Sequence, residues 1–253
     1  MNEITVMLPA YNEEGNIIEL IKKWENYKST LKLHYQLDLQ IVIINDGSVD
    51  QTKVIAERLQ EDYDNLKLIN HPVNQGLGMA VKTGIEYVLK NSSNSEYICF
   101  MDCDNTHDPK YIRDMIDKQK ETHADVVIAS RYQEGASVRG LSKLRRFTCQ
   151  AAKRVYGTSL HVKGVRDYTC GYRLYKRTIL EKLKDKFKDQ MIEESGFACM
   201  TELLYKLYAC GAVFAEVPFE LRYDFKQGDS KMKIIRTSIN SMKLVIKLKR
   251  IKT

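Results

Sequence analysis

The sequence predicts an α/β fold with a mostly parallel, doubly wound sheet, and three observations support this. The first 130 residues alternate between short apolar runs and longer segments whose apolar side chains have helical spacing. The run 39–44 is almost continuously apolar, as expected for a strand that helices cover on both faces. Polar, acidic or glycine-containing segments follow the apolar runs, so the strand ends are expected to meet at one ligand crevice.

The elements of the first half follow one another in strict alternation. A helix begins near Glu14 and carries the apolar residues Ile17, Ile18, Leu20, Ile21 and Trp24 on one side. Strands are predicted at 4–8, 39–44, 66–70, 97–101 and 126–129, and the other helices at 50–59, 79–89 and 110–119.

The second half is less regular. Residues 141–157 indicate a basic amphipathic helix or a pair of helices, and 195–211 a further helix. Residues 213–221 are expected to be extended, with Pro218 favouring the edge of a sheet. From Met232 on, apolar residues recur at 232, 235, 239, 242 and 246, which predicts one stripe of a C-terminal amphipathic helix.

Composition narrows the class of protein. At 253 residues and 43% hydrophobic, the chain can bury a full core as one domain with an extension. Charge begins at Glu3, so no signal peptide is expected, and no window of the sequence is apolar enough to span a membrane. The six cysteines form no CxxC pair, which favours reduced thiols and a cytoplasmic location.

The net charge of +7 is concentrated in two runs that contain no acidic residue. One lies between Glu134 and Asp167 and the other follows Asp229, and each holds eight Lys or Arg. Such patches bind phosphates, either on nucleic acid or at a membrane surface. Nucleic acid is the less favoured partner, because the patches lack interleaved aromatic residues and an acidic motif would repel a phosphate chain.

Two carboxylates stand one residue apart at the end of a predicted buried strand. Asp102 and Asp104 follow the apolar run 97–101. Like charges packed at a strand end repel each other, so a cation between them is expected. A hard divalent ion held by these carboxylates and by substrate phosphates fits the pattern. An Asp-rich turn without a ligand is the alternative.

Three further segments follow predicted strands. They are Pro9-Ala10-Tyr11-Asn12-Glu13, Asn45-Asp46-Gly47-Ser48-Val49-Asp50 and Asn74-Gln75-Gly76-Leu77-Gly78. Small and polar residues there allow a nucleotide to approach the backbone closely. Each segment alone also suits an ordinary turn or helix cap, and the glycines lack the full dinucleotide-binding fingerprint.

In this order the segments resemble the family 2 glycosyltransferases of the GT-A fold. The likeness covers residues 3 to about 232 and is strongest to the dolichyl-phosphate mannose synthase and polyprenyl-phosphate glycosyltransferase branch. Later segments that carry the resemblance are Ser130-Arg131-Tyr132, Arg145-Arg146, Asp167-Tyr168-Thr169-Cys170-Gly171-Tyr172-Arg173, Gly196-Phe197, Glu202-Leu203-Leu204, Glu216-Val217-Pro218, Arg222 and Gly228-Asp229-Ser230-Lys231.

The resemblance implies an inverting transfer of a hexose from a nucleotide sugar, of the GDP-mannose or UDP-glucose type, to a polyprenyl phosphate. It implies Mg²⁺ or Mn²⁺ on Asp102 and Asp104, which with Arg131 form the catalytic set. The implied donor-binding residues are Pro9, Tyr11, Glu13, Asp46, Asp102, Arg222 and Lys231. The implied acceptor-binding residues are Arg131, Arg145, Arg146 and Ser230.

The organisation implied is a glycosyltransferase domain at 1–230 and a basic amphipathic segment at 231–253. We expect that segment to lie on the cytoplasmic face of a membrane, making the protein peripheral. Packing of the stripe on the domain itself, or on a small membrane partner subunit, is the alternative.

The chain departs from the family pattern at three positions. Thr106 stands where the branch often has Gln, Asn45 replaces the first Asp of a common pair, and Cys149 replaces a Ser. The closest competing function is transfer to a saccharide hydroxyl. That reaction needs a general base late in the chain, for which Asp167 or Glu202 could serve. His107 could lie near the metal, or could simply start a helix or face solvent.

Overall fold

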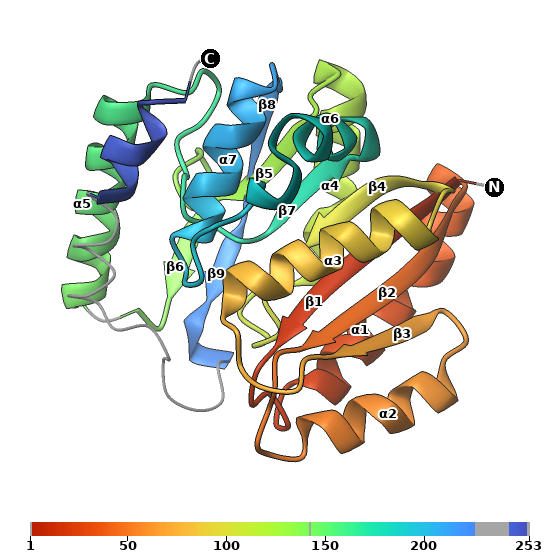
Figure 1. Cartoon of the computed structure of the whole chain (residues 1–253). Helices are drawn as coiled ribbons and strands as arrows, with labels where there is room; N and C mark the ends of the chain where they lie inside the picture. The colour runs from red at the N-terminus through yellow and green to blue at the C-terminus, as the bar shows by residue number, and fades with distance from the viewer. Residues whose placement is uncertain (1, 142, 226–242, 252–253) are drawn as a thin grey trace.

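The computed structural model describes residues 2–141, 143–225 and 243–251, and describes only the backbone of 143–147 and of 225. Its centre is a seven-stranded sheet in the order β3-β2-β1-β4-β7-β5-β8 (Figure 1). Every neighbouring pair is parallel except the two that involve β7. The strands are β1 (Asn2–Ala10), β2 (Leu37–Asn45), β3 (Leu66–Asn70), β4 (Ser95–Phe100), β5 (Val126–Ser130), β7 (Arg173–Lys176) and β8 (Phe214–Pro218). The predicted α/β fold with a mostly parallel sheet is therefore confirmed.

Helices cover both faces of the sheet. On one face α3 packs on β1 and β2 and contacts α6 and α7; on the other, α1 contacts α2, and α4 packs against β5 and β8. The helices are α1 (Ile17–Thr30), α2 (Thr52–Asp62), α3 (Leu77–Asn91), α4 (Ile112–Thr122), α5 (Lys143–Leu160), α6 (Arg177–Phe187) and α7 (Cys199–Ala209). Short helical turns are η1 (Leu31–Tyr35), η2 (Pro109–Tyr111), η3 (Lys188–Gln190) and η4 (Tyr223–Phe225).

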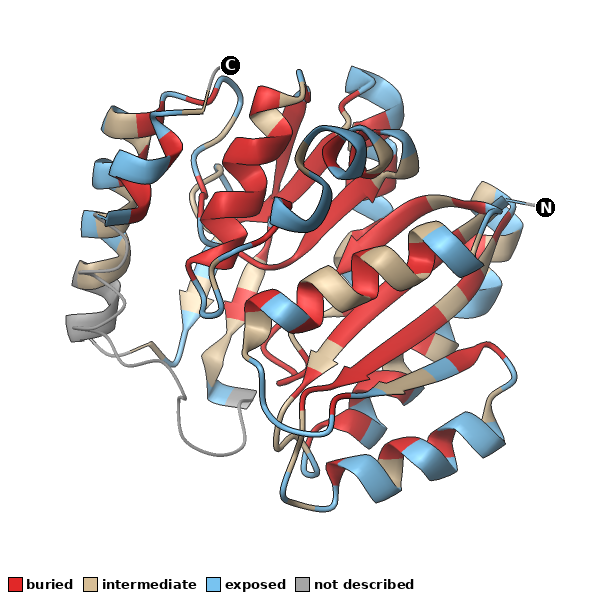
Figure 2. Ribbon diagram, viewed as in Figure 1, coloured by how far each residue is buried: buried red, intermediate tan, exposed pale blue. Residues whose placement is uncertain are grey.

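The core follows the apolar periodicity of the sequence. Of the predicted stripe of α1, Ile17, Leu20, Ile21 and Trp24 are fully buried, whereas the prediction was wrong for Ile18, which is 42% exposed. The second half of β2, residues 41–45, is buried at every position, as expected for a strand between two helical layers. Figure 2 shows this burial running through the central strands, while the outward face of α2 is exposed and that of α3 is mostly of intermediate burial.

Several elements differ in detail from the prediction. Residues 143–160 form one helix, not two. Helix α7 begins at Cys199 rather than at residue 195, because residues 196–198 form a turn in which the N–H of Cys199 bonds to the carbonyl of Gly196, three residues back, at 3.0 Å. Pro9 lies inside β1, paired with Ile44, and not beyond the strand end. Pro218 ends β8 at the edge of the sheet, as predicted.

A small second sheet was not predicted. Strands β6 (Ser137–Arg139) and β9 (Glu220–Arg222) pair in parallel. The backbone N–H of Arg222 also donates to the carbonyl of Thr106, at 3.0 Å. The small sheet thus lies against the loop that carries Asp102 and Asp104.

The end of the chain, as far as it is described, packs on the domain. Leu244, Val245 and Leu248 are buried in the core cluster, whereas Ile246 of the predicted stripe is 60% exposed. The rest of that stripe and the predicted boundary at 230/231 lie outside the described residues. Among residues the structure describes, no helix is both long and apolar enough to cross a membrane. All six cysteines are free thiols.

Candidate active site

The first two predicted donor segments are tied together at the ends of β1 and β2. The backbone N–H of Asn12 donates to Ser48 Oγ at 3.0 Å, and Asn12 Oδ1 accepts from the N–H of Val49 at 2.9 Å. The N–H of Glu13 donates to Thr52 Oγ1 at 2.7 Å. Because β1 and β2 are parallel neighbours, these loops leave the sheet at the same edge.

Asp46 fastens the glycine-rich loop to this edge. Its Oδ1 accepts from the N–H of Gln75 at 2.9 Å, and its Oδ2 from the N–H of Gly76 at 2.8 Å. Nδ1 of His71 lies 2.8 Å from the same Oδ1. The Asp46 carboxylate was predicted to bind the nucleotide-sugar donor. It already binds the backbone of the glycine-rich loop, so it would have to make both kinds of contact.

The two predicted metal ligands lie in one loop after β4. The side chain of Asp102 is 32% exposed, and that of Asp104 is largely buried. Oδ1 of Asp104 accepts from the Thr106 hydroxyl at 2.6 Å and from its N–H at 3.2 Å. Thr106, a departure from the family pattern, thus orients the second carboxylate.

The donor set suits a hard divalent cation that substrate phosphates also ligate. Within the described ranges, no cluster of three or more His, Cys, Asp or Glu could hold an ion by itself. Carboxylate oxygens with a position open to solvent fit Mg²⁺ or Mn²⁺, which bind through one or two carboxylates plus phosphates.

His107 is neither a solvent residue nor a helix start. Its ring is buried, 5.6 Å from the ring of Tyr172 and 5.5 Å from that of Phe219. Its Nδ1 stands 3.9 Å from Oδ2 of Asp102. His107 therefore lies next to the Asp102 carboxylate, on the side that faces the core.

Arg131 is held by a buried carboxylate. Its Nε donates to Oδ2 of Asp167 at 2.8 Å, and one terminal nitrogen donates to Oδ1 at 2.6 Å. Burial by itself would raise the pKa of the Asp167 carboxyl. The adjacent guanidinium and the hydrogen bonds outweigh burial and lower this pKa below its ordinary value. Asp167 is thus an anion that fixes the direction of Arg131.

The segment after Asp167 connects Arg131 with the metal loop. The same guanidinium donates to Thr169 Oγ1 at 2.6 Å. Two residues further on, a Cβ at Gly171 would stand only 3.3 Å from Oδ1 of Asp102. The absence of a side chain at Gly171 lets this backbone pass directly over the carboxylate. These links bring the predicted catalytic residues Asp102 and Arg131 to one place.

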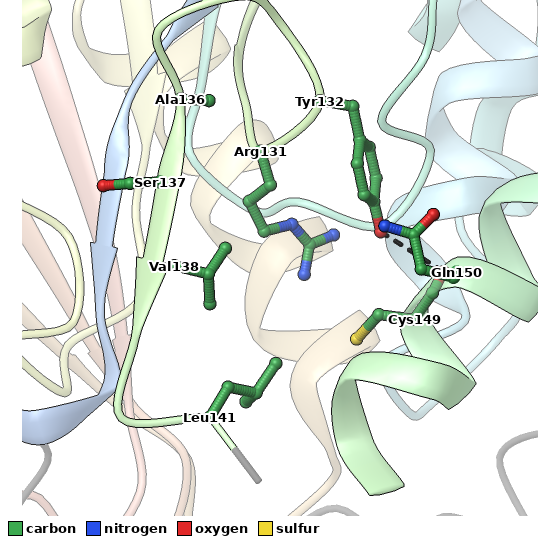
Figure 3. A pocket seen from close by; sticks show the side chains of 8 residues that line it. All are labelled: Arg131, Tyr132, Ala136, Ser137, Val138, Leu141, Cys149 and Gln150. Carbon is green, nitrogen blue, oxygen red and sulfur yellow. Dashed lines mark hydrogen bonds between the residues drawn. The ribbon is translucent and has the colours of Figure 1, made fainter. Parts of the chain in front are cut away.

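A pocket of about 250 Å³ opens beside Arg131. Figure 3 shows the guanidinium between Val138 and Leu141 on one side and Cys149 of α5 on the other. The Tyr132 hydroxyl donates to the carbonyl of Cys149 at 3.2 Å, which ties α5 to the end of β5. The lining residues are Arg131, Tyr132, Ala136, Ser137, Val138, Leu141, Cys149 and Gln150. The pocket therefore combines one cation with an apolar side formed by Ala136, Val138 and Leu141 and with the polar side chains of Ser137 and Gln150.

The remaining predicted residues are placed only in part. Arg222 forms a forked ion pair with Asp224, with contacts of 2.8 to 3.2 Å, at the side of the metal loop. The side chains of Arg145 and Arg146 lie outside the described residues, although their helix α5 borders the pocket. Ser230 and Lys231 also lie outside the described residues.

Neither carboxylate considered as a general base is open to a substrate. Asp167 and Glu202 are both 0% exposed. Asp167 is paired with Arg131, and Glu202 accepts from two backbone N–H groups and from Lys206. The sequence analysis missed the positioning roles of Asp167, Thr169 and Gly171. Their segment did stand out in the resemblance, but its contacts join residues far apart in the chain.

Loops at one edge of a doubly wound sheet carry two carboxylates and a partly buried arginine. This arrangement is that of a nucleotide-sugar transferase of the GT-A class. The profile of "Glycosyl transferase family 2" matches residues 5–184. The chain therefore belongs to glycosyl transferase family 2.

Curated relatives extend over most of the chain. It is 30% identical to "Dolichyl-phosphate beta-glucosyltransferase ALG5A" of Trichomonas vaginalis, over 96% of this chain and 73% of that protein. It is 28% identical to "Polyprenol monophosphomannose synthase" of Mycolicibacterium smegmatis, over 90% of this chain and 80% of that protein.

Solved structures share the fold at lower identity. S. aureus TarS 1–349 superposes with a TM-score of 0.60 at 17% identity, over 97% of this chain and 65% of TarS 1–349. Mannosyltransferase PcManGT from Pyrobaculum calidifontis, solved with GDP-Man and Mn²⁺, gives 0.54 at 16% identity, over 85% of this chain and 55% of that one. A protein of this fold has thus been solved together with a nucleotide sugar and a divalent metal.

Proposed function

We propose that the protein transfers a hexose from a nucleotide sugar to the phosphate of a polyprenyl phosphate. The observation that carries the proposal is the Arg131 pocket, which offers a fixed cation beside an apolar wall of Val138 and Leu141. A phosphate on a prenyl chain matches both features. The names of the two curated relatives, both polyprenyl- or dolichyl-phosphate glycosyltransferases, support the same acceptor class.

The reaction is a single displacement that needs no general base. An acceptor phosphate oxygen attacks the anomeric carbon, the bond from that carbon to the nucleoside diphosphate breaks, and the diphosphate leaves with the electron pair. Because the attacking oxygen is already anionic near neutral pH, no proton has to be removed. Asp167 and Glu202, the two carboxylates considered as general bases, are both buried and paired with cations. Their burial supports a phosphate acceptor over a saccharide hydroxyl, which would need an accessible base. Inversion at the anomeric carbon follows.

The residues of the chain supply positioning and charge. Asp102 and Asp104 would hold Mg²⁺ or Mn²⁺, which when bound neutralises charge on the diphosphate. Tyr11, Glu13, Asp46 and the backbone at Pro9 border the donor, and Arg222 and Lys231 meet its phosphates. Arg131, with Arg145, Arg146 and Ser230, gathers the acceptor phosphate. Positioning of two anionic substrates would account for most of the rate.

We also infer that residues 231–253 lie on a membrane surface, where a prenyl acceptor is found. The described part of this segment turns Lys243, Lys247, Lys249 and Arg250 outward, together with Ile246. Each exposed cation contributes roughly 1 kcal/mol near an anionic surface. This support is independent of the pocket.

A substrate panel tests the proposed function. Purified protein is incubated with UDP-glucose, GDP-mannose and related nucleotide sugars, each with a short polyprenyl phosphate or with free saccharides. We expect one donor to give a polyprenyl-phosphate sugar of inverted anomeric configuration and a nucleoside diphosphate. Transfer to saccharide hydroxyls with none to the prenyl phosphate would contradict the proposal.

A further inference from the structure

Two fully buried charged side chains stand one turn apart on α7. Glu202 and Lys206 are 0% and 2% exposed, and Oε1 of the first lies 2.8 Å from Nζ of the second. Taking two charges out of water costs several kcal/mol for each ion, so such a pair persists where additional hydrogen bonds compensate. Their other bonds therefore indicate what the pair holds.

The other side-chain hydrogen bonds that the structure shows for this pair go to one segment, residues 190–194, and Nζ of Lys206 also lies 5.3 Å from the ring centre of Phe187. Oε2 of Glu202 accepts from the backbone N–H groups of Glu193 and Glu194, at 2.9 and 2.8 Å. Nζ of Lys206 donates to the carbonyl of Gln190 and to Oε2 of Glu193. With Glu202, these contacts use all three donors of the ammonium group.

The segment held in this way, residues 190–195, contacts the glycine-rich loop at 74–78 directly. The carbonyl of Ser195 accepts from the N–H of Gly78 at 3.0 Å. A Cβ at Gly78 would lie 1.8 Å from the carbonyl oxygen of Glu194, and a Cβ at Gly76 would lie 2.4 Å from that of Ser195. The two backbones are thus in direct contact, and only glycine permits it.

The loop is therefore held from two sides. Asp46 binds the N–H groups of Gln75 and Gly76 from the sheet edge, and the carbonyls of Glu194 and Ser195, in the segment that precedes α7, contact the loop from the other side. Moving the 193–195 segment by even a fraction of an ångström would move the loop, since no side chain separates them.

We propose that Glu202 and Lys206 are positioning residues for the donor site, which fix the 193–195 segment and through it the glycine-rich loop. The proposal rests on the proposed function in one respect, namely that this loop borders the nucleotide sugar. It gives Glu202 a role without contact to either substrate, in contrast to the general base that a hydroxyl acceptor would need.

Surface charge adds little to this arrangement. Nζ of Lys247, in the C-terminal helical turn, lies 3.2 Å from Oε2 of Glu193, but both side chains are about 40% exposed. An exposed pair of this kind contributes little to stability, because water screens it. The buried pair on α7 is what sets the position of the segment.

The test replaces Glu202→Gln and compares it with Glu181→Gln. Glu181 forms an ion pair at the same i,i+4 spacing with Arg177, on α6, and is 46% exposed. Binding of UDP and GDP with Mn²⁺ is measured by calorimetry without acceptor, and amide exchange is measured at residues 76–79 and 193–196.

We expect Glu202→Gln to weaken binding of the preferred nucleotide about tenfold or more, the equivalent of one charge-assisted hydrogen bond. Exchange should speed up in both segments, and KM for the donor should rise while kcat at saturating donor and KM for the acceptor change little. Glu181→Gln should leave all of these values at wild type.

A double variant, Glu202→Gln with Lys206→Met, keeps the test decisive if the single variant does not fold. It leaves no buried charge unpaired, and we expect it to fold with the same loosened loop. Unchanged exchange and nucleotide affinity in a folded variant would overturn the proposal, as would a loss of kcat alone. If the wild-type protein binds no nucleotide, the proposed function fails. The positioning role is then decided by amide exchange at 76–79 alone: faster exchange in Glu202→Gln than in wild type supports it, and unchanged exchange overturns it.

Discussion

Replacing Asp167→Asn should destabilise the protein strongly, because it removes one partner of a buried ion pair. Asp167 is 0% exposed, and Arg131 donates to it through Nε at 2.8 Å and through a terminal nitrogen at 2.6 Å. The N–H of Cys170 donates at 3.1 Å as well. An Asn amide keeps one oxygen but turns an NH₂ toward these donors. Breaking a buried pair in this way costs about 3–5 kcal/mol.

The assay is urea unfolding followed by tryptophan fluorescence. Trp24 is the single tryptophan of the chain and is fully buried, so its emission reports on the folded core. With a urea slope of about 3 kcal/mol per M, the expected loss lowers the midpoint by about 1 M or more. Asp38→Asn is the matched control. Asp38 pairs with Lys32 at the surface, with both side chains about 40% exposed, and its loss should cost about 0–1 kcal/mol.

The difference between wild type and Asp167→Asn should also depend on pH. The folded-state pKa of Asp167 is lowered, so its stabilising contribution is complete above the ordinary carboxyl pKa of about 3.9 and is lost as pH falls below it. The difference is therefore expected to be constant from pH 7 to about 5 and to shrink below about 4. A variant as stable at pH 7 as the Asp38→Asn control would refute the reasoning.

Three further predictions concern the site. Asp104→Asn and EDTA should each remove most turnover; normal rates in both cases would rule out the metal assignment. Asp108→Asn is the control: its amide oxygen can still accept from the Lys110 N–H, and it loses only the exposed ion pair with Lys110, so it should cost about 0–1 kcal/mol of stability and leave turnover intact. Arg145→Ala should raise KM for the prenyl phosphate and leave nucleotide affinity nearly unchanged; an equal loss of nucleotide affinity would move this residue to the donor side. The protein should co-sediment with anionic liposomes at low salt and be released at high salt; protein that stays in the supernatant at low salt would exclude the membrane-surface role of 231–253.

Local patterns in the sequence were enough to predict the strands and helices of the first 130 residues, which form the parallel part of the sheet. The strands at 66–70 and 126–130 and the helix at 77–91 lie where periodicity predicted them, within one or two residues. Periodicity works here because both faces of these strands are covered, so each apolar run maps directly to burial. The position of Asp102 and Asp104 after a buried strand was predictable for the same reason.

The chemistry of single positions was less accessible. Thr106, seen in the sequence only as a departure from a pattern, donates to Asp104. Glu202, considered there as a base, is fully buried and holds the backbone of Glu193 and Glu194. The sequence shows which groups can donate or accept, but burial and partners depend on the packed structure.

Only the tertiary structure decided the arrangement around Arg131. Strand β7 is four residues long and inserts antiparallel between β4 and β5, and β6 pairs with β9 some eighty residues away. Asp167 meets Arg131 across 36 residues of chain. Such pairings carry no local signal, because short strands and single ion pairs gain their stability from surfaces that other elements supply. The sequence determined the sheet and the acidic edge; the packing of distant segments determined which cation faces it and how that cation is held.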